Sequence, residues 1–422
     1  MTEQLRCVLC RQTYPVGEVR YECDCHGLLA VEHPPAAWQG VDTELFDSRQ
    51  RGSAEIDLSG VWRFREVVRA LPPAAIITHP EGATRLYARA ALCRYAGLES
   101  LHFKHEGENP TGSFKDRGMT VATSQAVAQG ATAVACASTG NTSAALAAYA
   151  ARAGLQALVF LPAGKVALGK MAQTLAYGAR CFAVRGDFDA AMRLVTDVCR
   201  TLGVHLLNSK NPFRIEGQKT IVWEILQNLA WDPPDWIAVP AGNLGNTSAF
   251  GKAIEEAVAA GWIKRAPRLL AVQATGANPF YLSYAAGFRT RHRVQADTIA
   301  TAIRIGDPVS FDKARAAIEY TRGVVTEVTD PELMAAKRMI DQSGLGCEPA
   351  SACSLAGVRK MVAAGVIARG ERVVCVLTGN LMKDPDAVLE ELPGVASVAK
   401  PVEIEPTLDA VRALLAPGGR PG

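Results

Sequence analysis

The sequence lacks long apolar runs, a recognisable secretory signal and any marked net charge. No stretch of about 18 apolar residues, the length of a short membrane-spanning helix, occurs in it. Residues 1–6 are polar and lack the apolar core of a signal peptide, which predicts a cytoplasmic location. The 45 basic residues are balanced by 42 acidic ones, so nothing indicates a nucleic acid or a membrane surface as a partner. A small-molecule substrate is therefore the expected partner.

The chain also lacks the dense, regular cysteine spacing of a secreted disulfide protein. Of its 11 cysteines, four lie close together near the N-terminus and the rest are scattered. The pairs Cys7-x2-Cys10 and Cys23-x-Cys25 are typical of a zinc knuckle, an element too small to fold without its metal. His26 is an alternative to Cys25 as the fourth ligand, and a degenerate knuckle without metal is the other interpretation. With four positions filled, the role is structural in either case.

Short apolar or β-branched runs alternate with helical patterns along most of the chain. Such alternation is typical of parallel sheets that are buried on both faces. Two series of strands predict two doubly wound α/β domains with largely parallel sheets; the strands are 132–137, 157–161, 181–184, 204–207, 236–239, 269–272, 323–328 and 373–377. Helices are expected to begin at Asn141, Val166 and Asp187.

A lysine stands at the start of a predicted helix. The segment Asn-Pro-Thr-Gly-Ser-Phe-Lys-Asp-Arg-Gly at 109–118 follows a strand and leads into a helix over 116–129. Lys115 is then beside the positive end of the helix dipole in a mostly apolar setting, and both conditions lower the pKa of an amine. This pattern is weak by itself, because a lysine at a helix start is usually a solvated surface residue.

A loop rich in glycine and asparagine, Val-Pro-Ala-Gly-Asn-Leu-Gly-Asn-Thr at 239–247, follows another strand and opens another helix. Its backbone N–H groups can converge into an anion-binding nest. The spacing is not that of a dinucleotide site, and no Gly-Lys-Ser/Thr follows. The loop thus favours a phosphate monoester, with a plain strand-to-helix turn as the alternative.

Two further loops follow strands in the same way. Ala-Ser-Thr-Gly-Asn-Thr-Ser at 137–143 offers hydroxyl, amide and backbone donors to a carboxylate and a phenol-like oxygen, and Val-Leu-Thr-Gly-Asn at 376–380 ends the last strong strand. All four loops lie at the carboxyl ends of strands, where open parallel sheets bind their ligands. Together they predict a pyridoxal-phosphate site.

At this point the chain resembles the threonine synthases, in the tryptophan-synthase-β-like family of fold type II pyridoxal-phosphate enzymes. The resemblance covers nearly the whole chain and is most specific at 109–118; supporting stretches are 208–220, 298–306 and 348–352. It implies that Lys115 binds the cofactor covalently, that Asn141 bonds its 3′ oxygen, and that Thr378 faces its pyridine nitrogen. The loop that would cradle the cofactor phosphate comprises Gly242, Asn243, Leu244, Gly245 and Asn246. A hydroxyl at Thr378 would make a milder electron sink than a carboxylate.

The family reaction converts O-phospho-L-homoserine and water to L-threonine and phosphate by γ-elimination and β-addition. For its substrate, the resemblance assigns Ser138, Thr139 and Thr142 to the α-carboxylate. Asn208, Ser209 and Arg214 would bind the leaving phosphate, with Lys104 and Lys219 as weaker candidates. Lys219 is expected to be a solvated residue on a helix flank, and His105 to be a packing residue.

One departure from the family pattern keeps other functions open. Arg85 replaces the proline of the Gly-x-Thr-Pro-Leu pattern that often precedes the first core strand in the family. Another β-replacement or elimination enzyme of the same fold, such as a cysteate synthase or a serine/threonine dehydratase, is therefore the alternative activity. A non-catalytic phosphometabolite-binding or interaction protein is the alternative from a different class.

The resemblance also implies a domain plan and a homodimer. The expected parts are a knuckle-like element at 1–35, a large cofactor-binding domain at 36–108 and 209–415, a smaller inserted domain at 109–208, and a tail at 416–422. One domain is inserted in the other because Lys115 and Thr378 must meet across one cofactor.

Overall fold

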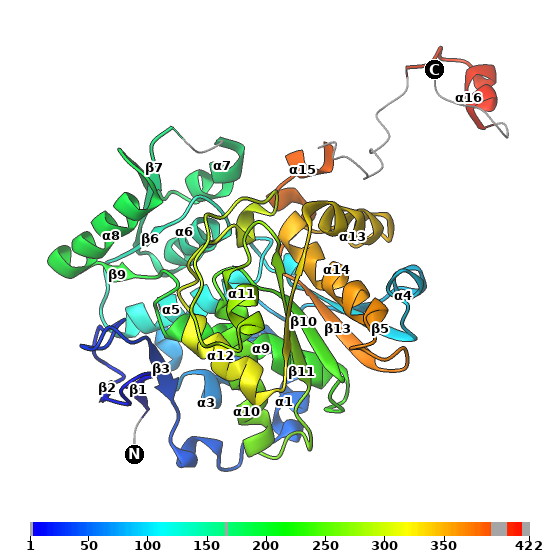
Figure 1. Cartoon of the computed structure of the whole chain (residues 1–422). Helices are drawn as coiled ribbons and strands as arrows, with labels where there is room; N and C mark the ends of the chain where they lie inside the picture. The colour runs from blue at the N-terminus through cyan, green and yellow to red at the C-terminus, as the bar shows by residue number, and fades with distance from the viewer. Residues whose placement is uncertain (1–2, 165–167, 390–402, 416–422) are drawn as a thin grey trace.

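The computed structural model describes residues 3–164, 168–389 and 403–415 (Figure 1). It contains two largely parallel sheets flanked by helices, and a small antiparallel sheet near the N-terminus. The predicted α/β class is therefore confirmed. The expected helix start at Val166 and the tail at 416–422 lie outside the described residues.

The larger sheet has six strands in the order β12-β11-β10-β13-β5-β4, all parallel except β4. Its strands are β4 (Leu86–Ala88), β5 (Ser100–His105), β10 (Trp236–Pro240), β11 (Arg268–Ala274), β12 (Val324–Val328) and β13 (Arg372–Leu377). Successive strand residues enter opposite cores: Ile237 and Val239 pack in one cluster, and Trp236 and Ala238 in another. Both faces are thus buried, as the continuous apolar runs predicted.

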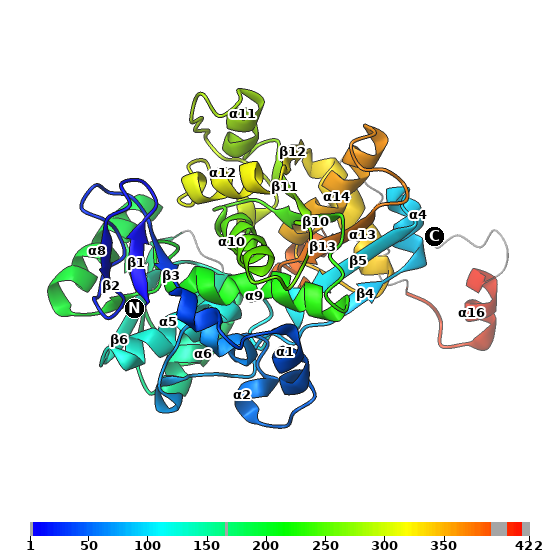
Figure 2. The same ribbon diagram turned by 90° about the horizontal axis from the view of Figure 1, so that it is seen from below.

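Helices cover both faces of this sheet (Figures 1 and 2). One face is covered by α9 (Phe213–Asn228), α10 (Gly245–Ala259) and α12 (Phe311–Tyr320), and the other by α4 (Ala90–Ala96), α13 (Asp330–Gln342) and α14 (Pro349–Ala363). The other α-helices described outside the segment 115–202 are α1 (Thr43–Gln50), α2 (Glu55–Leu58), α3 (Arg65–Val68), α11 (Pro279–Ala285), α15 (Asp386–Leu389) and α16 (Leu408–Leu415).

The smaller sheet has the order β8-β7-β6-β9 and is parallel throughout. Its strands are β6 (Ala133–Ala137), β7 (Gln156–Pro162), β8 (Arg180–Val184) and β9 (His205–Leu206), and its helices are α5 (Lys115–Ala128), α6 (Asn141–Ala153), α7 (Leu168–Ala176) and α8 (Phe188–Leu202). All eight strands predicted for the two sheets are present, with ends within two residues of the expected ones. The domain boundaries stay a prediction.

Glycines bring α5 and α9 into close contact at their N-terminal halves. A Cβ on Gly217 would lie 1.7 Å from the carbonyl oxygen of Arg117, and one on Gly118 would lie 3.1 Å from the carbonyl oxygen of Arg214. Only residues without side chains allow two helix backbones to approach so closely. The contact places the start of α9 beside the start of α5, where the predicted site begins.

The N-terminal sheet has the order β2-β1-β3, formed by β1 (Gln4–Cys7), β2 (Thr13–Pro15) and β3 (Leu29–Glu32). It docks on the larger body through β3, because Lys313 of α12 donates to the carbonyl of Leu29 and Lys252 of α10 donates to that of Val31, at 2.5 and 2.6 Å. The element is therefore anchored to helices of the larger sheet.

Candidate active site

Lys115 is the first residue of α5, one position earlier than predicted. Its amine lies 4.0 Å from the centre of the Phe114 ring and makes no hydrogen bond or ion pair with any described residue. Burial is the main cause of a lowered pKa, which falls to about 7, and the nearby Arg214 guanidinium lowers it further, against an opposing effect of Glu348. A large fraction of this amine is unprotonated at neutral pH, as a nucleophile and base require.

The loop before Lys115 is joined to the end of β13. Ser113 forms a β-bridge with Gly379, and the backbone N–H of Phe114 donates to the carbonyl of Thr378 at 3.0 Å. Thr378 is only 4% exposed. These bonds bring the predicted lysine and the predicted hydroxyl to one place from opposite ends of the chain.

Glu348 connects Thr378 with Asn141, and sequence reasoning did not assign it to the site. The amide of Asn141 donates to Oε2 of Glu348 at 2.9 Å, and the hydroxyl of Thr378 donates to Oε1 at 3.2 Å. Ser351 Oγ lies 3.0 Å from Thr378 Oγ1. The sequence indicated this residue only through the stretch at 348–352, which resembles the family but does not show what Glu348 does.

The predicted phosphate loop joins β10 to α10. Leu244 has a left-handed backbone with φ of +64°, and a Cβ on Gly242 would lie 2.9 Å from Ile303 Cα. The side chain of Asn243 is engaged, because it donates to Ser209 Oγ and accepts from the N–H of Val309 at 2.8 and 2.7 Å. These contacts fix the turn that opens the helix N-terminus.

Buried polar atoms without partners lie at this helix start. Asn246 Oδ1 and Thr247 Oγ1 are buried and have no hydrogen-bond partner among the described residues, and the same holds for Gln218 Oε1, which would lie 3.2 Å from a Cβ on Gly245. Leaving such atoms unsatisfied costs about 1–3 kcal/mol each, so a polar group is expected to bind here. The Thr247 hydroxyl, the backbone N–H groups and the helix N-terminus can donate to a phosphate, whereas the two amide oxygens can only accept. With Lys115 and Thr378 nearby, these donors fit pyridoxal phosphate.

The loop after β6 presents the predicted carboxylate donors. Ser138, Thr139 and Thr142 are all partly exposed beside the N-terminus of α6. The hydroxyl of Ser138 accepts from the N–H of Gly140 at 3.3 Å, so it is partly engaged within its own loop.

Arg214 is the strongest of the predicted phosphate ligands. It is 3% exposed, its Nε has no partner among the described residues, and its Nη1 donates to the carbonyl of Leu207 at 3.3 Å. Burial lowers its pKa to about 10. A buried guanidinium without a carboxylate is costly, so an anion is expected to bind beside it.

The other two predicted phosphate ligands are already engaged. Asn208 accepts from the N–H of Ala137 at 2.8 Å and donates to its carbonyl at 3.0 Å, which uses both ends of its amide. Ser209 accepts from Asn243, as described above. Both residues thereby fix loops of the site in place.

The two weaker candidates, Lys104 and Lys219, have no free amine. Lys104 is fully buried and pairs with Glu224 at 2.9 Å. Lys219 is fully buried as well and pairs with Glu216 and Glu256 at 2.6 and 2.9 Å, so the expectation that it is solvated was wrong. The helical pattern of α9 could not show that this flank faces a second helix.

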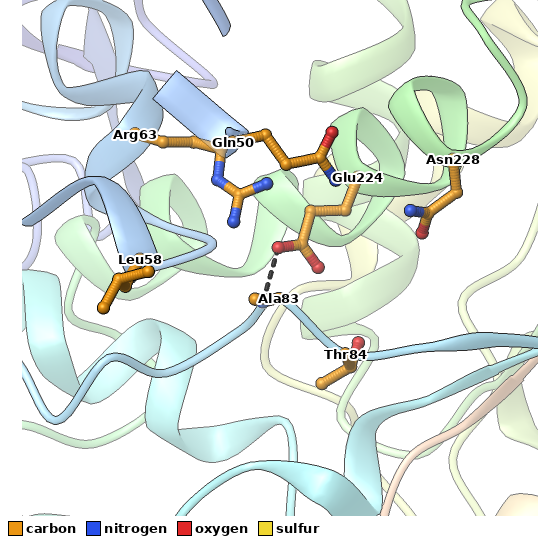
Figure 3. Close-up of a pocket in the computed structure, with 7 residues that line it drawn as sticks. All are labelled: Gln50, Leu58, Arg63, Ala83, Thr84, Glu224 and Asn228. Carbon is orange, nitrogen blue, oxygen red and sulfur yellow. Dashed lines mark hydrogen bonds between the residues drawn. The ribbon is translucent and has the colours of Figure 1, made fainter. Parts of the chain in front are cut away.

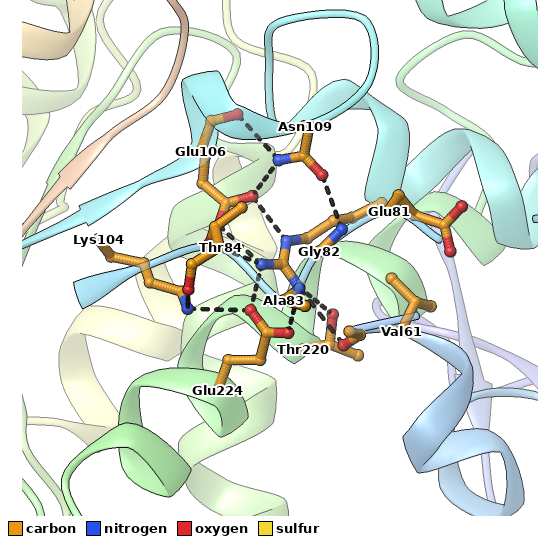
Figure 4. A network of polar contacts seen from close by, with 12 residues as sticks. Val61, Glu81, Gly82, Ala83, Thr84, Lys104, Glu106, Asn109, Thr220 and Glu224 are labelled. Atoms are coloured by element: carbon orange, nitrogen blue, oxygen red, sulfur yellow. Dashed lines mark hydrogen bonds and ion pairs between the residues drawn. The ribbon is translucent and has the colours of Figure 1, made fainter. Parts of the chain in front are cut away.

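Lys104 belongs to a buried network behind the lysine loop (Figure 4). Arg117, two residues after Lys115, is fully buried and forms ion pairs with Glu106 and Glu224. Glu106 also accepts from the amide of Asn109 at 2.9 Å. The network ties the loop at 109–118 to α9, which also carries Arg214.

Two other residues lie outside the site. His105 is buried, with Nε2 2.9 Å from the carbonyl oxygen of Leu345, in keeping with a packing role. Arg85 has a side chain that is 78% exposed and lies 3.8 Å from Glu108.

A cavity of about 160 Å³ is lined by Gln50, Leu58, Arg63, Ala83, Thr84, Glu224 and Asn228, and none of these residues belongs to the predicted site (Figure 3).

The four N-terminal cysteines form one cluster. Their sulfur atoms all lie within 4.8 Å of one another, and three pairs are separated by 3.4–3.5 Å. Zinc bound to four thiolates has Zn–S distances of about 2.3 Å, which puts the sulfurs about 3.8 Å apart. The arrangement is thus compatible with a tetrahedral metal site, and His26 is not part of the cluster.

Comparisons with known proteins agree with this geometry. Residues 77–379 match the family described as pyridoxal-phosphate dependent enzyme. The threonine synthase of Methanocaldococcus jannaschii is 42% identical over 97% of this chain and 98% of its own length, and that of Mycobacterium leprae is 46% identical over 76% and 88%. The solved structure of threonine synthase from Escherichia coli shares the fold, with a TM-score of 0.67 and 16% identity over 93% of each chain. The resemblance inferred from the sequence is confirmed.

Among the described residues, no helix is long and apolar enough to cross a membrane.

Proposed function

The chain belongs to the pyridoxal-phosphate-dependent enzyme family, and we propose that within it the protein acts as a threonine synthase, converting O-phospho-L-homoserine and water to L-threonine and phosphate. Curated relatives with this activity span almost the whole chain. The observation in the structure that carries the proposal is Arg214. Its buried guanidinium has no carboxylate partner among the described residues, and it lies close enough to Lys115 to lower the pKa of that amine. A phosphorylated substrate supplies the missing anion.

Pyridoxal phosphate, when bound, supplies the electron sink for negative charge that develops on the substrate carbons. Lys115 would hold it, with Asn141 and Thr378 directed to its ring and the loop 242–246 to its phosphate. Thr247 offers the buried hydroxyl described above as a donor to that phosphate. These assignments follow the family resemblance and the placement of the residues.

The remaining steps belong to side chains of the chain itself. The Lys115 amine, whose pKa is near neutral, would remove the proton from Cα of the substrate and later return a proton to a substrate carbon. Arg214 would bind the substrate phosphate and stabilise the charge that it carries as it leaves Cγ. The hydroxyls of Ser138, Thr139 and Thr142 and the N-terminus of α6 would bind the α-carboxylate. Asn208 would fix the loop of the phosphate site, because its amide exchanges two hydrogen bonds with the backbone of Ala137.

A substrate panel tests the proposal. The purified holoenzyme should release phosphate from O-phospho-L-homoserine and form an equal amount of threonine. The same preparation should show little turnover of O-phospho-L-serine with sulfite, or of threonine alone. Consumption of either of these without threonine formation would instead support the alternatives, a cysteate synthase or a serine/threonine dehydratase.

We also propose that Cys7, Cys10, Cys23 and Cys25 bind one structural zinc ion. Four thiols at the observed separations, on an element of three short strands, support a tetrahedral site. Elemental analysis should find one zinc per chain, and replacing Cys10 by serine should remove most of it. Zinc content that is unchanged by this substitution would contradict the assignment.

A homodimer in the cytoplasm is the further part of the proposal, and it rests on the family resemblance alone. Sedimentation equilibrium of the purified protein should give twice the chain mass of 44.9 kDa. A single species at the chain mass would contradict it.

A further inference from the structure

Glu348 is a buried carboxylate placed among the residues assigned to the cofactor. It immediately precedes α14 and is 4% exposed, yet its side chain does not cap that helix. Instead, it lies against Gly379, where a Cβ would come within 2.5 Å of its carboxyl carbon. The backbone N–H of Glu348 also donates to the carbonyl of Gly379 at 3.1 Å. Backbone and side chain are thus both fixed at the loop that follows β13.

Both carboxylate oxygens are used by residues of the site. Oε2 accepts from Asn141 at 2.9 Å and Oε1 from Thr378 at 3.2 Å. Ser351, one turn along α14, lies beside Thr378 and accepts from the N–H of Gly379 at 3.0 Å. These bonds hold the amide and the hydroxyl in fixed directions on either side of one carboxylate.

The charged groups that face Glu348 are cations. Lys115 of α5 and Lys383, at the end of the short helix Leu381–Lys383, both favour its ionised form, as do the bonds from Asn141 and Thr378, while burial opposes it and raises its pKa overall. The effect is mutual, since Glu348 raises the pKa of Lys115. The site therefore contains an acid that the roles assigned so far do not use.

We propose that Glu348 is a positioning residue that orients Asn141 and Thr378 toward the cofactor and places negative charge behind the hydroxyl of Thr378. The inference rests on the proposed function in one respect, which is that pyridoxal phosphate binds at this site. No contact with the substrate is assigned to Glu348. A hydroxyl alone does little to stabilise positive charge on a pyridine nitrogen. A carboxylate bonded to that hydroxyl adds the charge that the hydroxyl lacks, because an opposite charge within about 4–6 Å favours the protonated form. The expectation of a mild electron sink at Thr378 is revised accordingly.

The test is a pH titration of the visible absorbance of the holoenzyme, which reports the protonation of the lysine-bound cofactor without any substrate. Glu348→Gln keeps the shape and removes the charge, so the apparent pKa should fall by about one unit. Glu348→Asp keeps the charge, so its apparent pKa should lie closer to that of the unmodified protein, with at least half of the one-unit fall reversed. Glu327→Gln is the matched control, because Glu327 also accepts from an asparagine amide, that of Asn278, at 2.6 Å, and belongs to no part of the site. It should titrate like the unmodified protein.

Activity gives a second readout. In Glu348→Gln, kcat should fall at least tenfold while KM changes less than threefold, because the residue orients groups around the cofactor and not around the substrate. If this variant does not fold, Thr378→Val removes the hydroxyl that links the charge to the ring and should shift the titration in the same direction. A titration that is unchanged in a soluble variant at either position overturns the inference. A holoenzyme without the visible band would instead refute the proposed function itself.

Discussion

Replacing Glu224 by glutamine removes the carboxylate that Lys104 and Arg117 share in the buried network behind the lysine loop (Figure 4). Burial raises the pKa of Glu224, but Arg117, Lys104 and, to a smaller extent, Arg63 outweigh it and lower the pKa from an ordinary 4.5 to about 2. A shift of that size corresponds to about 3 kcal/mol of folding free energy. Breaking a buried ion pair from one side generally costs about 3–5 kcal/mol, because the remaining charge is left unpaired. We therefore expect Glu224→Gln to lose about 3 kcal/mol.

Urea unfolding at several pH values measures this loss. Because the folded pKa of Glu224 is depressed, its contribution is complete above the unfolded pKa near 4.5 and is lost as pH falls through about 2. The difference between the unmodified protein and Glu224→Gln should therefore be largest at neutral pH and shrink steadily below about pH 4.

Glu319→Gln is the control for a solvated pair. Glu319 bonds Arg315 on the surface of α12 with a side chain that is 54% exposed, and such pairs contribute about 0.5 kcal/mol or less. The reasoning would be refuted if Glu224→Gln were within about 1 kcal/mol of the unmodified protein at pH 7, or if its deficit grew as the pH fell.

Three further predictions concern the helix contact, the phosphate ligand and the metal. Gly217→Ala should lower the free energy of unfolding by about 3 kcal/mol or more in a urea titration, because its Cβ meets the Arg117 carbonyl, whereas Gly370→Ala, with nothing within 4 Å, should be nearly neutral. Arg214→Met should lower kcat/KM for the phosphorylated substrate about 100-fold while the cofactor band persists, and an unchanged value would remove Arg214 from the phosphate site. Removing the metal with a chelator should lower the melting temperature of the protein. A melting temperature that the chelator leaves unchanged would contradict a structural zinc ion.

Local patterns in the sequence were sufficient to place the strands and the loops that follow them. Apolar runs predicted β6, β7, β10 and β13 to within a residue or two, because a strand buried on both faces must be apolar along its length. Glycine and asparagine after a strand predicted the turns at 140 and 242–246. The reason differs from the expected one in the second turn, because the left-handed residue there is Leu244, and Gly242 is required by the close approach of Ile303. The motif at 109–118 placed Lys115 at a helix start for the same local reasons.

Partners that come from distant segments could not be predicted. The sequence analysis assigned no role to Glu348, because only the fold brings Asn141 and Thr378 to its two oxygens. Lys219 looked like a solvated lysine because α9 gives no sign that its polar flank meets Glu256 of α10. Likewise, the sequence did not show that the amide of Asn208 is hydrogen-bonded to the backbone of Ala137. A buried polar residue is explained by its partner, and the partner is set by topology.

The most direct measurement of the central claim is the fate of the oxygen in ¹⁸O-labelled water during turnover of O-phospho-L-homoserine. If Arg214 binds a phosphate that leaves with its bridging oxygen, and water then adds at Cβ, the label must appear in the hydroxyl of threonine and not in the released phosphate. The account predicts this pattern, and predicts that Lys115→Ala abolishes both products. Label in the phosphate without threonine would mean that water attacks phosphorus, and would contradict the account.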